Sequence, residues 1–253
     1  MPIRKYILKA FLLGASLYSA LYRLVFRNFE IKDFKHFERK IHSQNGEDGI
    51  IDAIFKKIGT TNTYCVEFGI HPREGNSIYL RQQGWECLWM DGNGDGSSIK
   101  KEFITAENIN ALFGNYSVPK EFDLLSIDID SNDYWVWQAI RDFTPRVVVI
   151  EYNASIPPSQ SKSVAYDPEL HWDGSSYFGA SLLALKKLGE SKGYTLITCD
   201  EKGINAFFVR NELVAGNFKT RTIDEIYRRP GYGDVVNGKH IGHPPSDKAM
   251  LTV

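Results

Sequence analysis

Apolar and polar positions follow two different patterns along most of the chain, one typical of helices and one typical of strands. Between residues 46 and 58, Ile50, Ile51, Ile54 and Phe55 recur every three to four positions, which predicts an amphipathic helix. Weaker versions of this periodicity predict helices at 75–83, 105–114, 133–143 and 179–190, and Thr105 is the expected N-cap of the helix at 105–114. Short, nearly continuous apolar runs predict strands at 63–69, 86–91, 103–104, 122–130, 146–153, 194–200 and 205–210.

The order of these elements defines a fold class. Repeated strand–helix units with apolar strands are typical of a parallel sheet that helices cover on both faces. The last two runs, YTLITCD and NAFFVR, are separated only by EKGI and predict a hairpin, so one strand should be antiparallel. We therefore expect an α/β, Rossmann-like domain over residues 30–216, followed by an irregular C-terminal tail at 217–253.

Residues 1–29 differ from the rest of the chain because they contain five basic residues and no acid. On a helical projection Lys5, Lys9, Arg23 and Arg27 share one stripe with two serines, and the other faces are apolar or small. This pattern predicts a helix whose residues 3–27 lie in the headgroup region of a membrane. Three alternatives stay open: a tilted membrane span, an uncleaved organelle-targeting presequence, and a helix that packs on its own domain or a sister subunit.

Composition narrows the function classes. The chain has 253 residues, 43% of them hydrophobic, which suffices for one large domain or two small ones. A formal net charge of -1 does not point to a nucleic-acid partner. Cys65, Cys87 and Cys199 are widely spaced without a C-x-x-C pair. We expect buried thiols in a reducing compartment, on the cytoplasmic face of a membrane.

The turn after the first predicted strand matches a nucleotide-binding turn only in part. The strand carries Glu67 and stops at Gly69, but the next glycine is Gly75, so the G-x-G-x-x-G of a dinucleotide site is absent. The second strand ends in another acid, Asp91. A nicotinamide-dependent oxidoreductase is therefore disfavoured.

Four motifs in this order, SQNGEDGIIDAIF, VEFGIHPREGNS, GWECLWMDGN and FDLLSIDID, resemble those of the FkbM-type branch of class I S-adenosylmethionine-dependent methyltransferases. The resemblance extends from about Ser43 to Arg210. It implies a seven-stranded, mostly parallel sheet whose last strand is antiparallel, and it implies S-adenosylmethionine as the cofactor.

The resemblance also implies a set of cofactor-binding residues, namely Glu67, Gly69, Gly75, Asp91 and Asp128. One glycine suffices for close approach to a ligand without a pyrophosphate, and an acid suits the cationic methionine end. Asp91 would accept hydrogen bonds from the ribose hydroxyls. Two alternatives stay open: Glu67 pairs with Arg73 or Arg81, or Asp91 only opens an Asx-turn.

Polar side chains also follow the fourth and fifth predicted strands, in SIDIDSND and IEYN. Because neighbouring parallel strands end at the same edge of a sheet, Asp128, Asp130, Glu151 and Asn153 should lie together. Three carboxylates and an amide oxygen are a ligand set for Mg²⁺ or Ca²⁺, which could hold an acceptor hydroxyl. Alternatively Asp130 or Glu151 is a general base without a metal, or two of the four cap the helix that starts at Asp133.

The long loop after the fifth strand is expected to cover an acceptor pocket. His171 lies in this loop and is a further candidate base, although a histidine that only packs in the loop would look the same. The aromatic residues around it would suit a sugar or planar acceptor. No N/D-P-P-Y/F motif ends the fourth strand and no basic cluster surrounds it, so nucleic acid is disfavoured as a partner.

The sequence therefore favours O-methyl transfer from S-adenosylmethionine to a hydroxyl of a sugar, glycolipid or other small molecule. The alternative is a catalytically inactive protein of the same fold that serves as a subunit or assembly factor of a membrane-associated complex.

Overall fold

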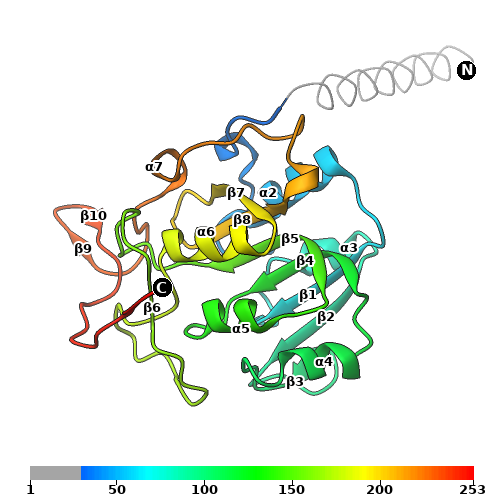
Figure 1. Ribbon diagram of the computed structural model, residues 1–253, viewed down its shortest axis with the longest axis horizontal. Helices are drawn as coiled ribbons and strands as arrows, with labels where there is room; N and C mark the ends of the chain where they lie inside the picture. Colours follow the sequence, from blue (N-terminus) through cyan, green and yellow to red (C-terminus); the bar gives the residue numbers. More distant parts are fainter. Residues whose placement is uncertain (1–29) are drawn as a thin grey trace, which may run out of the picture.

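The computed structural model describes residues 30–253, so the predicted basic helix within residues 1–29 lies outside the described residues. One seven-stranded sheet organises the molecule, in the order β3-β2-β1-β4-β5-β8-β7 (Figure 1). Its strands are β1 (Tyr64–Phe68), β2 (Glu86–Asp91), β3 (Lys100–Lys101), β4 (Glu121–Ile127), β5 (Thr144–Glu151), β7 (Tyr194–Cys199) and β8 (Asn205–Arg210). β8 lies antiparallel between β5 and β7, and β1 to β5 pair in parallel. The expected α/β architecture, with a mostly parallel sheet and one antiparallel strand, is confirmed and is compatible with a Rossmann-like fold.

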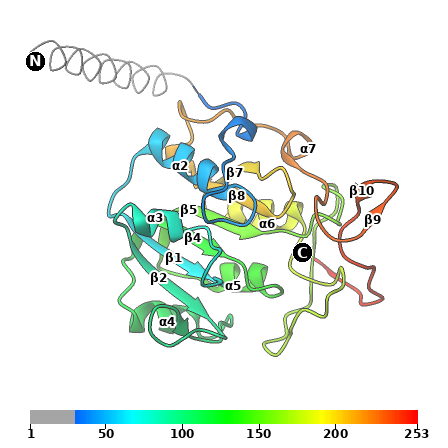
Figure 2. The ribbon, with the colours of Figure 1, turned by 180° about the vertical axis from the view of Figure 1, so that it is seen from behind.

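Helices cover both faces of this sheet (Figure 1, Figure 2). They are α2 (Glu47–Ile58), α3 (Ile78–Gln82), α4 (Ile109–Asn115), α5 (Asp133–Ala139), α6 (Leu182–Ser191) and α7 (Ile223–Ile226), with the 3-10 turns η1 (Lys35–Phe37) and η2 (Asn211–Leu213). Ile54 of α2 and Leu80 of α3 pack on one face, whereas Trp137 of α5 and Leu185 of α6 pack on the other. Within residues 30–253, no helix combines the length and the apolar character needed to cross a membrane.

The central strands are apolar throughout because both of their faces are buried. Val148 belongs to the core under α5 and α6, and its neighbour Val149 belongs to the core under α2. Both are fully buried. Successive side chains of a central strand therefore lie in the two cores alternately. Because both cores are apolar, the sequence of the strand is a continuous apolar run.

Two local predictions differ from the structure. The third strand is Lys100–Lys101 rather than Phe103–Ile104, because the short pairing with β2 uses the residues beside Met90 and Asp91. Thr105 does not cap α4, which begins at Ile109. The Oγ1 atom of Thr105 instead accepts a hydrogen bond from the backbone N–H of Asn108, 3.3 Å away, and forms a turn before the helix.

The prediction of three free thiols was wrong for two of them. Cys65 on β1 and Cys87 on β2 lie directly opposite each other in the parallel register, with their Cα atoms 4.7 Å apart, and form a disulfide. Their separation of 22 residues concealed this contact, because only the strand pairing brings the two together. Cys199 is free and buried, as expected. The disulfide removes the thiol argument for a reducing compartment.

Residues 217–253, termed the C-terminal segment below, pack on the same domain. Phe218 and Ile226 are buried in the two cores. Near the end of the chain, β11 (Leu251–Thr252) pairs with β6 (Lys162–Ser163), so the segment lies beside the long loop of residues 152–181 (Figure 1). A hairpin of β9 (Val235–Val236) and β10 (Lys239–His240) is exposed. Short elements joined by irregular stretches make up the segment, and its two anchor points, Phe218 and Ile226, are buried.

Candidate functional site

The candidate site lies where the chain direction across the sheet reverses, between β1 and β4. From β1 the sheet continues to β2 and β3, and from β4 it continues to β5, so the loops after β1 and β4 diverge and leave a crevice at the carboxyl edge. A cavity of about 480 Å³ occupies this edge, and its lining includes Gly69, Asp91, Asp128, Asp130 and His171. A second cavity of about 110 Å³ shares Gly69 and Asp128 with the first and adds Glu67 and Gly75.

Gly69 lines both cavities, and its backbone conformation and its neighbours leave room only for glycine. Its φ is +71°, and a Cβ atom built on it would lie 1.5 Å from the carbonyl oxygen of Asp128. Gly69 was expected to allow a ligand to approach the backbone closely. In the structure, it allows the end of β4 to approach. Gly75 is constrained in a similar way, because a Cβ atom there would lie 2.7 Å from the side chain of Ile70.

Glu67 holds the turn that follows Gly69. One carboxylate oxygen accepts the backbone N–H of Asn76 at 2.7 Å, and the other accepts the N–H of Ser77 at 2.9 Å and its hydroxyl. The described residues show no ion pair between Glu67 and either Arg73 or Arg81, because both carboxylate oxygens bind the turn and Arg81 lies over the ring of Trp89. Burial is the main reason why the pKa of Glu67 rises to about 7. The side chain lines the smaller cavity while it orders the backbone of the turn.

Asp91, the last residue of β2, opens an Asx-turn and also lines the larger cavity. Its Oδ1 atom accepts the N–H of Asn93 at 2.5 Å. Asp91 is half-buried and lines the cavity together with Gly92 and Asn93, the first residues of the glycine-rich loop. A role of Asp91 in the Asx-turn and a role in ligand binding are therefore compatible. Glu102, Phe103 and Ile104, which follow β3, line the same cavity beside it.

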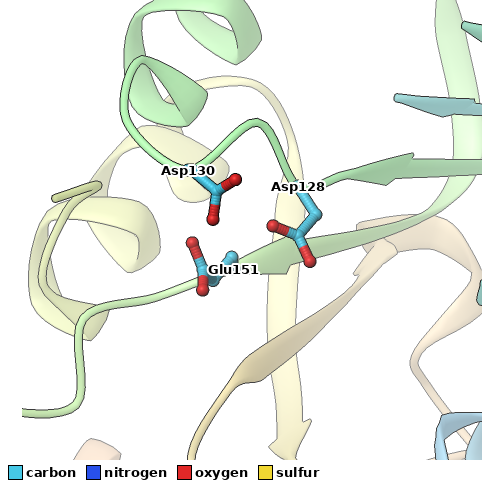
Figure 3. Close-up of side chains that lie close together, drawn as sticks. All are labelled: Asp128, Asp130 and Glu151. Atoms are coloured by element: carbon cyan, nitrogen blue, oxygen red, sulfur yellow. The ribbon is translucent and has the colours of Figure 1, made fainter. Parts of the chain in front are cut away.

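Asp128, Asp130 and Glu151 form a cluster of carboxylates at the ends of β4 and β5, termed the carboxylate cluster below. Each contributes one oxygen to a group whose members all lie within 4.8 Å of one another. Figure 3 shows the three side chains pointing toward one another. Asp130 adopts a left-handed backbone with φ of +62°, which turns the chain after β4. Asp128 and Asp130 line the larger cavity.

The electrostatics of the carboxylate cluster disfavour full ionisation. Burial raises the pKa of Asp128 and of Glu151 well above the usual range, and the charges of neighbouring carboxylates raise both further. Burial and the charge of Asp91 raise the pKa of Asp130. Asp133, the first residue of α5, is fully buried, and burial raises its pKa to about 6. Within the described part of the chain, none of these four acids is in an ion pair.

Asn153 was predicted beside these acids, but its polar atoms are engaged elsewhere. Its amide donates to the carbonyl oxygens of Ser176 and Phe178, and its Oδ1 atom accepts the N–H of Ser155. We therefore leave Asn153 out of the ligand set and assign it to the anchoring of the long loop. The capping alternative is also wrong, since the N-cap of α5 is Asn132, which makes no side-chain capping bond.

The long loop is fixed as a wall of the larger cavity. Asn132 donates from its amide to the carbonyl of Asp167 at 2.8 Å, and Ser131 donates from its hydroxyl to the carbonyl of Leu170 at 3.2 Å. These bonds place His171 and Trp172 in the cavity lining, where the ring of His171 packs on Phe103 with centroids 5.6 Å apart. Among the other aromatic residues near this loop, Tyr152 and Trp137 are buried in the core, whereas Trp135, Tyr166 and Tyr177 are only partly buried.

Sequence reasoning missed the contribution of the C-terminal segment. His243 packs against Trp172 and Tyr232, with ring centroids 4.6 and 5.1 Å apart. The charge of Asp130 acts on His243, and the charge of Glu151 acts on Tyr232, so both rings lie near the carboxylate cluster. More than ninety residues separate His243 from Glu151, and no local pattern in the sequence marks the contact. Asp133 could have been found, since it continues the acidic run SIDIDSND.

Comparison with known proteins does not assign the chain to a family. No protein-family model matches it, and no curated protein matches it at a significant level. Function is therefore inferred from the residues and the geometry of this edge of the sheet.

Proposed function

We propose that the protein is an S-adenosylmethionine-dependent methyltransferase that acts on a hydroxyl group. The observation that carries the proposal is the pair of cavities joined at Gly69 and Asp128, with one acid at the end of β1 and another at the end of β2. The sheet agrees with the seven-stranded arrangement that the FkbM-type resemblance implies, including an antiparallel last strand. In open α/β sheets, ligands bind in the crevice at this switch point.

The two cavities fit the two halves of this cofactor. The larger one offers Asp91 to the ribose hydroxyls, and the residues after β3, with Phe103 and Ile104 among them, offer an apolar wall to the base. The smaller one is lined by Glu47, Glu67 and other acids, which suit a cationic amino acid end. When bound, the cofactor supplies a methyl group on a cationic sulfur that a hydroxyl oxygen can attack.

The chain's own residues would handle the acceptor. Asp130 is exposed within the larger cavity and would accept the hydroxyl proton at a carboxylate oxygen as the hydroxyl oxygen gains the methyl group. A carboxylate with a raised pKa is a stronger base than an ordinary one, which favours that transfer. His171 lines the same cavity and is the second candidate base. Trp172 and Phe103 offer aromatic faces to a sugar or another ring-shaped acceptor.

Calorimetric titration of S-adenosylmethionine into the full chain tests the cofactor assignment. The parent protein should bind it, and Asp91→Ala should weaken binding by about 1–3 kcal/mol, because the ribose hydroxyls would lose a charged acceptor. Asp95→Ala is the matched control: Asp95 is an exposed acid of the same glycine-rich loop, outside the lining of both cavities, and its loss should leave affinity unchanged.

Transfer of a labelled methyl group to a library of hydroxyl compounds then tests the reaction. Absence of any binding heat for the parent protein would overturn the assignment and favour the alternative of a catalytically inactive subunit or assembly factor in a membrane-associated complex. Binding without transfer to any hydroxyl would keep the cofactor and reject the acceptor class.

A further inference from the structure

When its three side chains are ionised, the carboxylate cluster carries more negative charge than its surroundings balance. Asp128, Asp130 and Glu151 lie within 4.8 Å of one another, and none of them is in an ion pair within residues 30–253. The Oε2 atom of Glu151 is buried and has no hydrogen-bond partner there. Neighbouring carboxylates at this distance repel one another strongly in a site with little water. A positive charge at the centre of the cluster would remove that repulsion.

Asp133 provides a second, independent observation in favour of a cation at the cluster. It is fully buried at the start of α5, and its Oδ1 atom accepts the N–H of Ile129 at 2.9 Å. Its Oδ2 atom is buried without a partner, and its charge acts on Asp128 and Glu151. A buried carboxylate oxygen without a hydrogen bond is unfavourable unless a proton or an ion satisfies the group. Asp133 therefore lies against the turn that joins Asp128 to Asp130 and adds a further carboxylate near the cluster.

The geometry suits a hard divalent ion. Such ions prefer carboxylate oxygens at about 2.0–2.6 Å, so two oxygens on opposite sides of one ion lie about 4–5 Å apart. The oxygen atoms of the cluster lie no more than 4.8 Å apart, so one ion could contact all three side chains. Asp130 is exposed and lines the larger cavity, so an ion held here would keep positions open to water or to an acceptor oxygen.

We propose that Asp128, Asp130 and Glu151 form a binding site for one divalent cation of the Mg²⁺, Mn²⁺ or Ca²⁺ class, with Asp133 close to them. The site rests on the geometry of these side chains and is independent of the methyl donor. Its use in holding an acceptor hydroxyl at the cavity wall rests on the proposed function. There the ion would lower the pKa of the hydroxyl and aim its oxygen.

Mn²⁺ is the probe for this site, because its electron paramagnetic resonance signal distinguishes free from bound ions without any turnover. The full chain, freed of metals with a chelator and kept without cofactor, should bind one Mn²⁺ that Mg²⁺ or Ca²⁺ displaces. Asp130→Asn and Glu151→Gln should each weaken Mn²⁺ binding at least about tenfold. Asparagine tolerates the left-handed backbone of residue 130, so the first variant keeps the turn after β4.

Two controls keep the result interpretable. Glu169→Gln removes an exposed acid of the long loop outside the cavity lining, and its Mn²⁺ affinity should equal that of the parent. In chelator, both cluster variants should melt at or above the temperature of the parent, because each removes a repelling charge, whereas a misfolded variant would melt lower.

Equal Mn²⁺ affinity in the parent, Asp130→Asn and Glu151→Gln would overturn the cation site, as would the absence of a bound ion at millimolar Mn²⁺. A proton shared among the carboxylates would then account for the cluster. Calorimetry with S-adenosylmethionine separates this result from failure of the proposed function. A protein that binds the methyl donor but no Mn²⁺ loses only the cation site, and one that binds Mn²⁺ but no donor loses only the methyltransferase proposal.

Discussion

Gly69 is the residue on which the geometry of the candidate site most directly depends. Its Cβ position is blocked by the carbonyl of Asp128 at 1.5 Å, so any side chain must push the ends of β1 and β4 apart. Gly69→Ala should therefore lower the free energy of unfolding, as measured by urea denaturation. Left-handed backbone strain should contribute about 1–2 kcal/mol of this loss, and overpacking should contribute about 1–3 kcal/mol. It should also abolish cofactor binding in the folded fraction.

Gly84 provides a matched control for Gly69. Its φ is +89°, but no atom lies within 4 Å of its Cβ position, so Gly84→Ala introduces strain without a collision. The loss of stability for Gly84→Ala should be smaller by about 1–3 kcal/mol, the contribution of overpacking. If the two substitutions had equal effects, the contact between Gly69 and Asp128 would not constrain the site.

At the scale of elements, the sequence predicts strands better than it predicts what the loops bring together. Residues 147–150 are fully buried on both faces of the sheet, and such burial leaves a continuous apolar run in the sequence. β3 was misplaced because it consists of two lysines and carries no apolar signal. Asp128, Asp130 and Glu151 could be predicted to meet, since parallel strands end at one edge.

The parts that sequence could not supply depend on tertiary contacts between distant segments. Cys65 and Cys87 meet through strand register. His243 reaches the long loop only because the C-terminal segment turns back along it. Asn153 was predicted to be a metal ligand because of its position after β5. Its amide instead donates hydrogen bonds to carbonyls of the long loop. Position along a strand predicts proximity, and competing hydrogen bonds decide the role.

The end of the sheet opposite the site is held by a buried ion pair. Arg146 on β5 donates to Asp123 on β4 at 2.7 Å and to the carbonyl of Gly59, while Asp123 also accepts the N–H groups of Thr61 and Thr63. Asp123→Asn would leave the guanidinium charge buried and place an amide against backbone donors. Urea denaturation should show a loss of about 3–5 kcal/mol.

Glu121→Gln on the same strand is the control, because its partner Arg210 lies at the surface and the pair is partly exposed. Exposed pairs contribute about 1 kcal/mol or less, so this variant should stay close to the parent in stability. Cofactor affinity should be unchanged in both variants, since the pair lies away from the carboxyl edge. A small loss for Asp123→Asn would show that the loop before β1 does not depend on this ion pair.

At the scale of the whole molecule, the first described residues pair with the C-terminal segment. Ile31 exchanges backbone hydrogen bonds with the C-terminal segment, donating to Asn217 and accepting from Lys219, both at 2.9 Å. Phe34 is buried in the core under α2. These contacts assign residues 31 and 34 to the folded domain. The basic, acid-free sequence of residues 1–29 is the basis for the predicted membrane role.

Deletion of residues 1–29 should leave a folded, cofactor-competent domain in the soluble fraction, because Ile31 and Phe34 hold the start of the described chain against the domain. In the full chain, changing Lys5, Lys9, Arg23 and Arg27 together to Gln should weaken binding to anionic vesicles. Each basic residue contributes about 1 kcal/mol near such a surface, and high salt should weaken binding by the parent in the same way. A spanning helix would instead stay in the membrane through salt and alkaline carbonate. A helix that packs on the domain would expose apolar surface when deleted, so aggregation of the truncated protein, with no vesicle binding by the parent, would reject the membrane anchor.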